Sequence, residues 1–200
     1  GGALKNEYYD AYARYFTKYV QAMQKEEITI DAVTVQNEPL NSHNTPSMPW
    51  YWQQQNEFVR DHLGPAFKDA GLKTKILIFD HNCDRPDYPL AILKDPVTSQ
   101  YIDGSAFHHY RGYMSSMNIV HRARPDKNIY FTEQMLIERP GSQTINIAPS
   151  VRRLIVDVTR NWSKNTILWN FAADPLNDPH TDPGGCSLCQ GANTIDGHKV

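Results

Sequence analysis

Two glutamates, Glu38 and Glu133, stand where they could do acid–base chemistry. Each follows an apolar run: Glu38 comes near the end of AVTVQNEPL, residues 32–40, and Glu133 ends NIYFTE, residues 128–133. Both runs have the residue types of buried strands. Two carboxylates in one cavity can protonate a leaving oxygen and attack the carbon that it leaves, which is the chemistry of glycoside cleavage. Pro39 restricts the residue before it, so we expect Glu38 to be extended where its strand ends.

Further polar and aromatic side chains follow the other predicted strands. They are Gln36-Asn37, Asp80-His81-Asn82, His108-His109-Tyr110, Thr132, Gln134 and Trp169-Asn170. The C-terminal ends of parallel strands share one edge of an α/β protein, and ligands bind at that edge. We therefore expect these groups to converge. A sugar ring suits such a mixture, because its C–H faces stack on Trp and its hydroxyls bond to Asn, His and carboxylate groups.

The elements that must position these groups alternate between helix and strand. Apolar residues at helical spacing predict helices over residues 7–26, 51–70, 86–93, 114–124 and 148–162. Short apolar runs predict strands over residues 28–36, 75–80, 101–108, 128–133 and 166–171. Gly71 is a candidate cap for the second helix, which Gly64-Pro65 is expected to kink. The alternation is typical of an α/β fold with a parallel sheet covered by helices.

The composition is that of an ordinary globular domain. The 200 residues are 40% hydrophobic and 21% charged, and the net charge is −2. Lys and Arg do not cluster, which argues against a nucleic-acid partner. No apolar run approaches the roughly 20 residues of a transmembrane helix. Cys186 and Cys189 form a single C-x-x-C pair, only half of a four-cysteine zinc site, which predicts either a short disulfide or two free thiols.

Several of these residues also suit roles outside catalysis. The histidines at the strand ends match no H-x-H or H-E-x-x-H motif, so hydrogen bonding or packing is favoured over metal binding, and we predict no metal. Trp50 and Trp52 could line a sugar subsite or pack in the core, whereas Trp162 is better suited to core or helix packing. An open doubly wound sheet that binds a nucleotide is disfavoured, because no Gly-rich phosphate loop follows a predicted strand.

In order and spacing, long segments of the sequence resemble glycoside hydrolase family 30. Asn-Glu-Pro, residues 37–39, is shared by the larger clan of (β/α)8-barrel retaining glycosidases. The more specific segments are GGALKNEYYDAYARYFTKYVQAM, EFVRDHLGPAF, DHNCDRPDYPLAILKDP, YIDGSAFHHY, PDKNIYFTEQ, TRNWSKNTILWNFAAD and GGCSLCQGANTID. They are similar to the glucosylceramidase and endo-β-1,6-glucanase members, and the resemblance covers nearly the whole chain.

The resemblance implies a role for each residue that matches a family motif. Glu38 matches the general acid/base, and Asn37 the residue that binds the sugar 2-hydroxyl. Glu133 matches the nucleophile, and Tyr110 a tyrosine that hydrogen-bonds the nucleophile and helps keep it ionised. Trp169 matches a sugar-stacking tryptophan. These are the two catalytic candidates and three of the substrate-binding candidates.

His81, His108 and Asn170 complete the expected substrate-binding set. A retaining mechanism implies carboxyl groups about 5–5.5 Å apart. The pKa of Glu38 is then expected to rise while Glu133 is negative, and to fall once Glu133 carries the sugar. The resemblance implies no cofactor.

A family member is larger than this sequence. It has about eight barrel strands and a β-sandwich built partly from the chain ends, whereas the present sequence supplies about strands four to eight and starts Gly1-Gly2-Ala3 without Met. We expect a partial (β/α)8 TIM barrel, with residues 1–175 in the catalytic domain and residues 176–200 in a loop-rich tail towards the sandwich. The missing N-terminal half of the same polypeptide is the expected partner. Alone, a barrel with two unpaired edges is expected to be inactive and prone to aggregate.

Three departures from the family pattern lie near the expected site. His109 stands where members commonly have Trp, which removes one sugar contact. The segment QMLIERPGS, residues 134–142, differs from the small-residue loop of the family. Asp178 and Asp182 are inserted into a segment that resembles the family's Gly-Gly-Pro loop.

The expected substrate is a β-glucoside, either β-1,6-linked glucan or glucosylceramide. The Gly-Gly-Cys-Ser-x-Cys tail, residues 184–189, favours glucan. The alternative is an inactive carbohydrate-binding fragment of such an enzyme. The expected location is outside the cell, in a periplasm or in a lysosome-like compartment.

Overall fold

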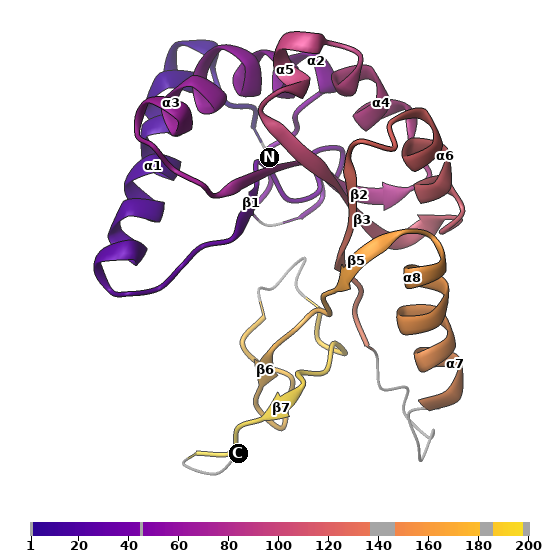
Figure 1. The fold of residues 1–200 in the computed structure, drawn as a ribbon. Helices are drawn as coiled ribbons and strands as arrows, with labels where there is room; N and C mark the ends of the chain where they lie inside the picture. The colour runs from indigo at the N-terminus through magenta and orange to yellow at the C-terminus, as the bar shows by residue number, and fades with distance from the viewer. Residues whose placement is uncertain (1, 45, 137–146, 181–185, 198–200) are drawn as a thin grey trace.

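The computed structural model describes residues 2–44, 46–136, 147–180 and 186–197. Five parallel strands form one sheet in the order β1-β2-β3-β4-β5, and β6 pairs with β7 in a small second sheet. Figure 1 shows the large sheet curling, with helices along its outer side. The predicted α/β fold and partial barrel are confirmed, since the five strands make about half of a barrel wall.

The strands are β1 (Ala32–Thr34), β2 (Lys75–Cys83), β3 (Ile102–Gly112), β4 (Asn128–Glu133), β5 (Ser163–Thr166), β6 (Ala172–Ala173) and β7 (Asn193–Thr194). The helices are α1 (Tyr9–Lys25), α2 (Trp52–Glu57), α3 (Gly64–Asp69), α4 (Asp87–Leu93), α5 (Pro96–Ser99), α6 (Ser116–Ala123), α7 (Ile147–Val151) and α8 (Val158–Arg160). A 3-10 turn, η1 (Asn6–Tyr8), precedes α1, and the π-helical segments η2 (Phe58–Leu63) and η3 (Arg152–Asp157) join α2 to α3 and α7 to α8. Every predicted helix is present, and α5 is an addition.

The predicted helix over residues 51–70 is continuous from α2 through η2 to α3. The π segment η2 ends directly before Gly64-Pro65, and the N–H of Gly64 bonds to the carbonyl of Val59. Pro65 has no N–H to continue the regular ladder. Gly71 ends the helix with a φ of 66°, and the N–H of Leu72 donates to the Phe67 carbonyl at 2.9 Å. The predicted glycine cap is therefore confirmed.

Both strands at the sheet edges differ from their predictions, and the central strands β2 and β3 run past their predicted ends at residues 80 and 108, to Cys83 and Gly112. The strand predicted over residues 28–36 is shorter, because β1 pairs with β2 only from Ala32 to Thr34. The strand predicted over residues 166–171 starts earlier, at Ser163. Its apolar side chains were expected in the core, but Ile167 is 51% exposed. An edge strand has one neighbour, so the apolar pattern fixes its limits poorly.

The main core lies between the helices and the outer face of the sheet. Its largest fully buried side chains include Trp50, Tyr9, Tyr88, Phe58, Phe79, Phe107 and Phe131. The indole Nε1 of Trp50 donates to the Tyr9 hydroxyl at 3.0 Å, so Trp50 packs in the core rather than lining a sugar subsite. Trp52 also packs against this core. Trp162 is 56% exposed, so it is not in the core, but it stacks on His121 of α6, which is the helix packing that the sequence offered as its alternative.

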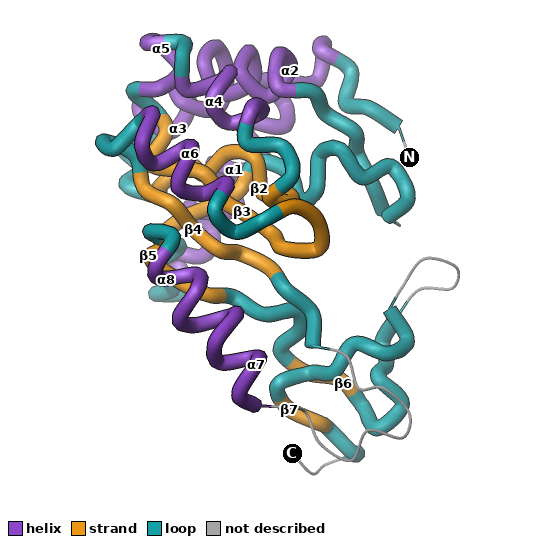
Figure 2. Tube along the Cα trace, turned by 90° about the vertical axis from the view of Figure 1, so that its right-hand side faces the viewer, coloured by secondary structure: helices purple, strands orange, loops and turns teal. Residues whose placement is uncertain are grey.

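The C-terminal segment forms the small sheet, which lies apart from the five-stranded one (Figure 2). Cys186 and Cys189 are joined in a disulfide, which decides between the two alternatives left by the sequence.

The boundary predicted at residue 175, between the catalytic domain and the tail, stays a prediction. Asp182 and residues 137–142 lie outside the described residues. Among the described helices, none has the length and apolarity that a bilayer crossing requires.

Candidate active site

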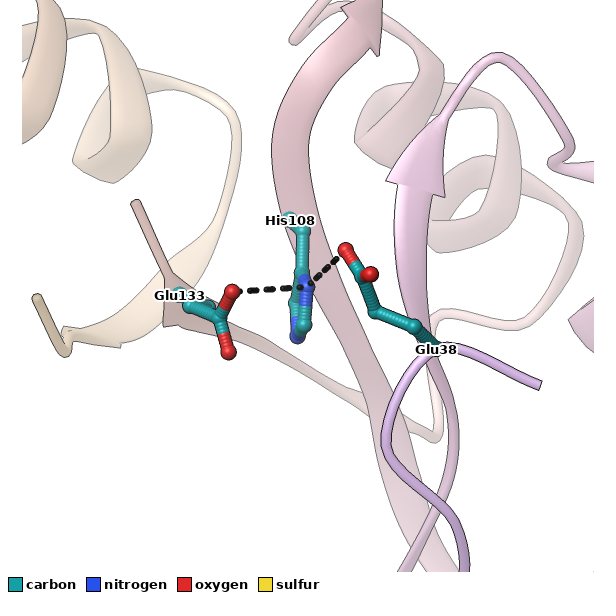
Figure 3. Close-up of side chains that lie close together, drawn as sticks. All are labelled: Glu38, His108 and Glu133. Carbon is teal, nitrogen blue, oxygen red and sulfur yellow. Dashed lines mark hydrogen bonds and ion pairs between the residues drawn. The ribbon is translucent and has the colours of Figure 1, made fainter. Parts of the chain in front are cut away.

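Glu38 follows β1 in a left-handed backbone conformation. Its φ is 45°, and its N–H donates to the Asp80 carbonyl at 2.9 Å. The extended conformation expected from Pro39 is therefore wrong. Residues other than glycine adopt a positive φ when surrounding contacts over-determine it, and such residues gather at functional sites. Here the N–H of Asn41 also donates to the Glu38 carbonyl at 2.9 Å, which closes a turn and directs the carboxylate toward His108 (Figure 3).

The carboxylate of Glu38 is buried, and both of its oxygens are occupied. Oε2 accepts from the side-chain amides of Asn41 at 2.6 Å and Asn44 at 2.9 Å. Oε1 lies 3.2 Å from Nδ1 of His108. The side chain is 6% exposed. A carboxylate with this many donors is held firmly as an anion.

Glu133, at the end of β4, is more accessible and has fewer partners. The Tyr110 hydroxyl donates to Oε1 of Glu133 at 2.9 Å and accepts from the Met135 N–H at 3.0 Å. The Glu133 side chain is 19% exposed. The hydrogen bond that the family resemblance implied between Tyr110 and Glu133 is therefore present.

His108, on β3, lies between the two glutamates, as Figure 3 shows. Its Nδ1 is 3.2 Å from Glu38 and 3.7 Å from Glu133, and the imidazole is 1% exposed. Ligand atoms from these three side chains all lie within 4.8 Å of one another, which brings one oxygen of each carboxylate within that distance. The structure thus joins residues far apart in the sequence into one site.

Asp80, on β2, holds the other side of the imidazole. His108 Nε2 is 2.9 Å from Oδ1 of Asp80. The Thr132 hydroxyl donates to the same oxygen at 2.6 Å, and the Thr34 hydroxyl donates to Oδ2 at 2.6 Å. Four strands, β1 to β4, are linked through this one buried carboxylate.

The charges of the site follow from these contacts. Burial acts to lower the pKa of His108, but its bonds to Asp80 and Glu38 and the charges of Asp80 and Glu133 outweigh it and raise that pKa to about 10. Burial acts to raise the pKa of Glu38, but the hydrogen bonds from His108, Asn41 and Asn44 and the His108 charge lower it to about 2. Imidazolium at position 108 therefore faces carboxylate at position 38.

Glu133 is shifted in the opposite direction. Burial raises the pKa of Glu133, while the His108 charge and the Tyr110 hydrogen bond act against that rise. The sequence led us to expect the raised pKa on Glu38 instead. The difference arises because His108 Nδ1 lies closer to Glu38 than to Glu133, and because two amides add to its effect.

The same three side chains could geometrically surround a cation. Their ligand atoms lie within 4.8 Å of one another. However, a metal bound to His108 would have to replace the proton on Nδ1, which faces the carboxylates of Glu38 and Glu133. In the described part of the chain we therefore assign the cluster to proton chemistry.

The remaining predicted site residues lie outside this cluster of contacts. Asn37 is exposed, and His81 is buried beside the Phe79 ring. Trp169 is half-exposed. Its backbone N–H donates to the Gln134 carbonyl at 2.9 Å, which places Trp169 beside the end of the Glu133 strand. The Asn170 carbonyl accepts from Ala192 at 3.0 Å. Within the described residues, none of these four side chains hydrogen-bonds to either glutamate.

Five polar residues of the site had no predicted catalytic or substrate-binding role: Asp80, Asn41, Asn44, Thr34 and Thr132. Asp80 and Thr132 stand at predicted strand ends, and that position was the one signal available for them. The two asparagines lie in a loop, where sequence alone does not show which side chain turns back to Glu38.

Comparison with known proteins gives a consistent result. Residues 1–180 match the glycosyl hydrolase family 30 TIM-barrel domain. The chain is 34% identical over 197 residues to an endo-1,6-beta-D-glucanase of Neurospora crassa, covering 96% of the chain and 40% of the relative. It is 23% identical over 202 residues to the lysosomal acid glucosylceramidase of Mus musculus, covering 90% of the chain and 38% of the relative.

A solved structure, the endo-beta1,6-glucanase BT3312, superposes with a TM-score of 0.90 at 38% identity, covering 97% of the chain and 44% of that protein. The chain thus spans about 40% of the length of the curated relatives that it matches. The half-barrel, the two glutamates at its strand ends and the family match over residues 1–180 agree. The chain belongs to glycosyl hydrolase family 30.

Proposed function

We propose that the complete protein is a retaining glycoside hydrolase that cleaves β-glucosidic bonds by double displacement. The observation that carries the proposal is the distance between the two carboxylates, whose nearest ligand oxygens lie within 4.8 Å. Retaining enzymes hold their carboxyl groups about 5–5.5 Å apart, whereas inverting enzymes leave about 6.5–9.5 Å for a water molecule. The spacing therefore supports direct attack by one glutamate.

Glu133 is the proposed nucleophile, as the resemblance implies. Its side chain is 19% exposed, against 6% for Glu38, and among the described residues the side chain that hydrogen-bonds to it is Tyr110, at Oε1. A lone pair on Oε2 can therefore reach an anomeric carbon. Both oxygens of Glu38 are already engaged by donors, which suits it less for attack.

Glu38 is the proposed acid/base. In the first step Glu133 forms an ester bond to the anomeric carbon, the glycosidic bond breaks, and the leaving oxygen takes its electron pair and a proton from Glu38. In the second step Glu38 accepts a proton from water, the water oxygen bonds to the anomeric carbon, and the ester bond breaks. The described state, with Glu38 ionised, corresponds to the second step. Negative charge on Glu133 before the first step acts to raise the pKa of Glu38.

The proposed substrate is β-1,6-linked glucan. Support comes from the Neurospora crassa relative and from the BT3312 structure, which are both named for endo-1,6-glucanase activity. Glucosylceramide is the second candidate, because a more distant relative is named as a glucosylceramidase. Secretion, expected from the family, is part of the same proposal.

The test uses the complete polypeptide and proton NMR of the first products. With β-1,6-glucan, we expect the new reducing ends to appear as the β-anomer, before mutarotation produces the α-anomer. Glucosylceramide serves as the parallel substrate. An α-anomer formed first would refute the retaining mechanism, and reversible binding without hydrolysis of either substrate would favour the inactive carbohydrate-binding alternative.

A further inference from the structure

Asp80 occupies a break in the regular pairing of β2. Both Phe79 and Asp80 have positive φ, at 77° and 55°, and the register between β2 and β3 shifts between Phe79 and His81. A bulge of this kind re-aims a side chain beside an active site. The Phe79 N–H is not lost to the break, because it donates to Oε1 of the buried Gln55 at 2.9 Å.

The bulge directs the Asp80 carboxylate to the imidazole of His108. The bond from Nε2 to Oδ1 is 2.9 Å long, and the hydroxyls of Thr34 and Thr132 fix both carboxylate oxygens. Asp80 is 5% exposed and touches neither glutamate through its side-chain hydrogen bonds. Its side-chain hydrogen bonds therefore reach the glutamates through His108, while its charge also repels that of Glu133 directly and acts to raise the pKa of Glu133.

We propose that Asp80 is a positioning residue, which keeps His108 cationic and oriented so that one Nδ1–H serves both glutamates in turn. This inference rests on the proposed function. During double displacement the negative charge changes place: Glu133 carries it before attack, and Glu38 carries it while the sugar is bound to Glu133. Nδ1 lies 3.2 Å from Glu38 and 3.7 Å from Glu133, so a fixed imidazolium can stabilise either carboxylate.

Other charged or titratable groups near the imidazole must be considered. Glu38 comes from the loop after β1, Asp80 and His81 from β2, Tyr110 from β3 and Glu133 from β4. Burial lowers the pKa of His81, and burial beside Glu133 raises the pKa of Tyr110, so both remain neutral near pH 7. Asp80 is the carboxylate that lies closest to the imidazole, at 2.9 Å.

The experiment compares Asp80→Asn with the wild type in the complete polypeptide. Asparagine keeps the size of the side chain but removes its charge, so we expect His108 to lose its proton at a lower pH. The readouts are histidine-selective NMR titration, with the His108 signal identified by its loss in His108→Gln, and the pH profile of kcat. We expect the His108 midpoint to fall by at least one pH unit, and the alkaline limb of kcat to move down with it while KM changes less than twofold.

Two further variants separate this role from a structural one. Thr34→Val removes one donor to Asp80 without touching either glutamate, and we expect a shift in the same direction that is smaller than for Asp80→Asn. Asp103→Asn is the matched control, because Asp103 accepts from Asn128 and Tyr130 elsewhere on the sheet. That variant is expected to leave both the His108 midpoint and the pH profile unchanged.

The outcomes distinguish this inference from the proposed function. Folded Asp80→Asn and Thr34→Val proteins with a wild-type His108 midpoint and pH profile would overturn the role of Asp80. If the wild type hydrolysed no β-glucoside, the proposed function would fail, while the NMR titration would still report whether Asp80 holds the proton on His108. If Asp80→Asn does not fold, the Thr34→Val shift decides: its presence supports the role and its absence overturns it.

Discussion

Glu133→Gln is expected to lower kcat on β-1,6-glucan by on the order of 10⁴-fold or more, the scale seen when a covalent nucleophile is removed. Glutamine keeps the shape of the side chain and can still accept the hydrogen bond from Tyr110. Its neutral amide cannot form the ester to the anomeric carbon. Steady-state hydrolysis by the complete polypeptide measures the loss.

The matched control is Glu26→Gln, which makes the same chemical change at an exposed position after α1. Its kcat is expected to stay within twofold of the wild type. Glucan binding by Glu133→Gln, measured by calorimetry, separates loss of chemistry from loss of the site. A Glu133→Gln protein that turned over at a rate near the wild type would show that another group attacks the sugar.

The effect of Glu38→Gln is expected to depend on the leaving group. General acid catalysis contributes on the order of 10²–10⁴-fold, so hydrolysis of glucan should slow by about that factor. An aryl β-glucoside with a good leaving group needs little protonation, so its first step should slow far less. Parallel kcat/KM measurements on the two substrates check this difference, which is not expected for a residue that only supports the fold.

Added azide gives a sharper assignment of Glu38. In a Glu38→Ala variant the glycosyl-enzyme on Glu133 still forms from an activated glucoside, and azide can attack it without a general base. Because two displacements then occur at the anomeric carbon, the product should be the β-glucosyl azide. An α-glucosyl azide would mean that azide had replaced the nucleophile, and would reverse the roles of the two glutamates.

The pKa shifts of the two glutamates, taken alone, favour the opposite assignment, with Glu38 as nucleophile and Glu133 as acid. In the described chain the pKa of Glu38 is lowered to about 2 by the His108 and asparagine contacts that outweigh burial, while burial raises the pKa of Glu133. Groups whose environments separate their pKa values in this way often divide into base and acid. Exposure and the Tyr110 contact favour Glu133 as nucleophile, so the roles need a direct test.

The sequence predicted the scaffold of the site better than its interior. Apolar runs placed β2, β3 and β4, and the rule that parallel strands share one C-terminal edge brought Glu38, His108 and Glu133 together before any coordinates. These features depend on hydrophobic periodicity and chain direction, which a sequence displays.

Local backbone geometry could not be predicted in the same way. Phe79, Asp80 and Glu38 have positive φ although none is glycine, and that arises from tertiary contacts such as the Gln55 bond to Phe79. For the same reason Asp80 was expected at the shared edge of the sheet without a predicted role in the site. The limits of β5 were misplaced because the apolar residues that follow it, such as Ile167 and Phe171, are exposed beside a sheet edge rather than buried in the core.

The most direct measurement is to trap the covalent intermediate. The complete polypeptide is incubated with a fluorinated mechanism-based β-glucoside, digested, and sequenced by tandem mass spectrometry. We predict that the added sugar mass lies on Glu133, in the peptide that contains NIYFTE, residues 128–133. A label on Glu38, or an active enzyme that no such inhibitor labels, would contradict the account.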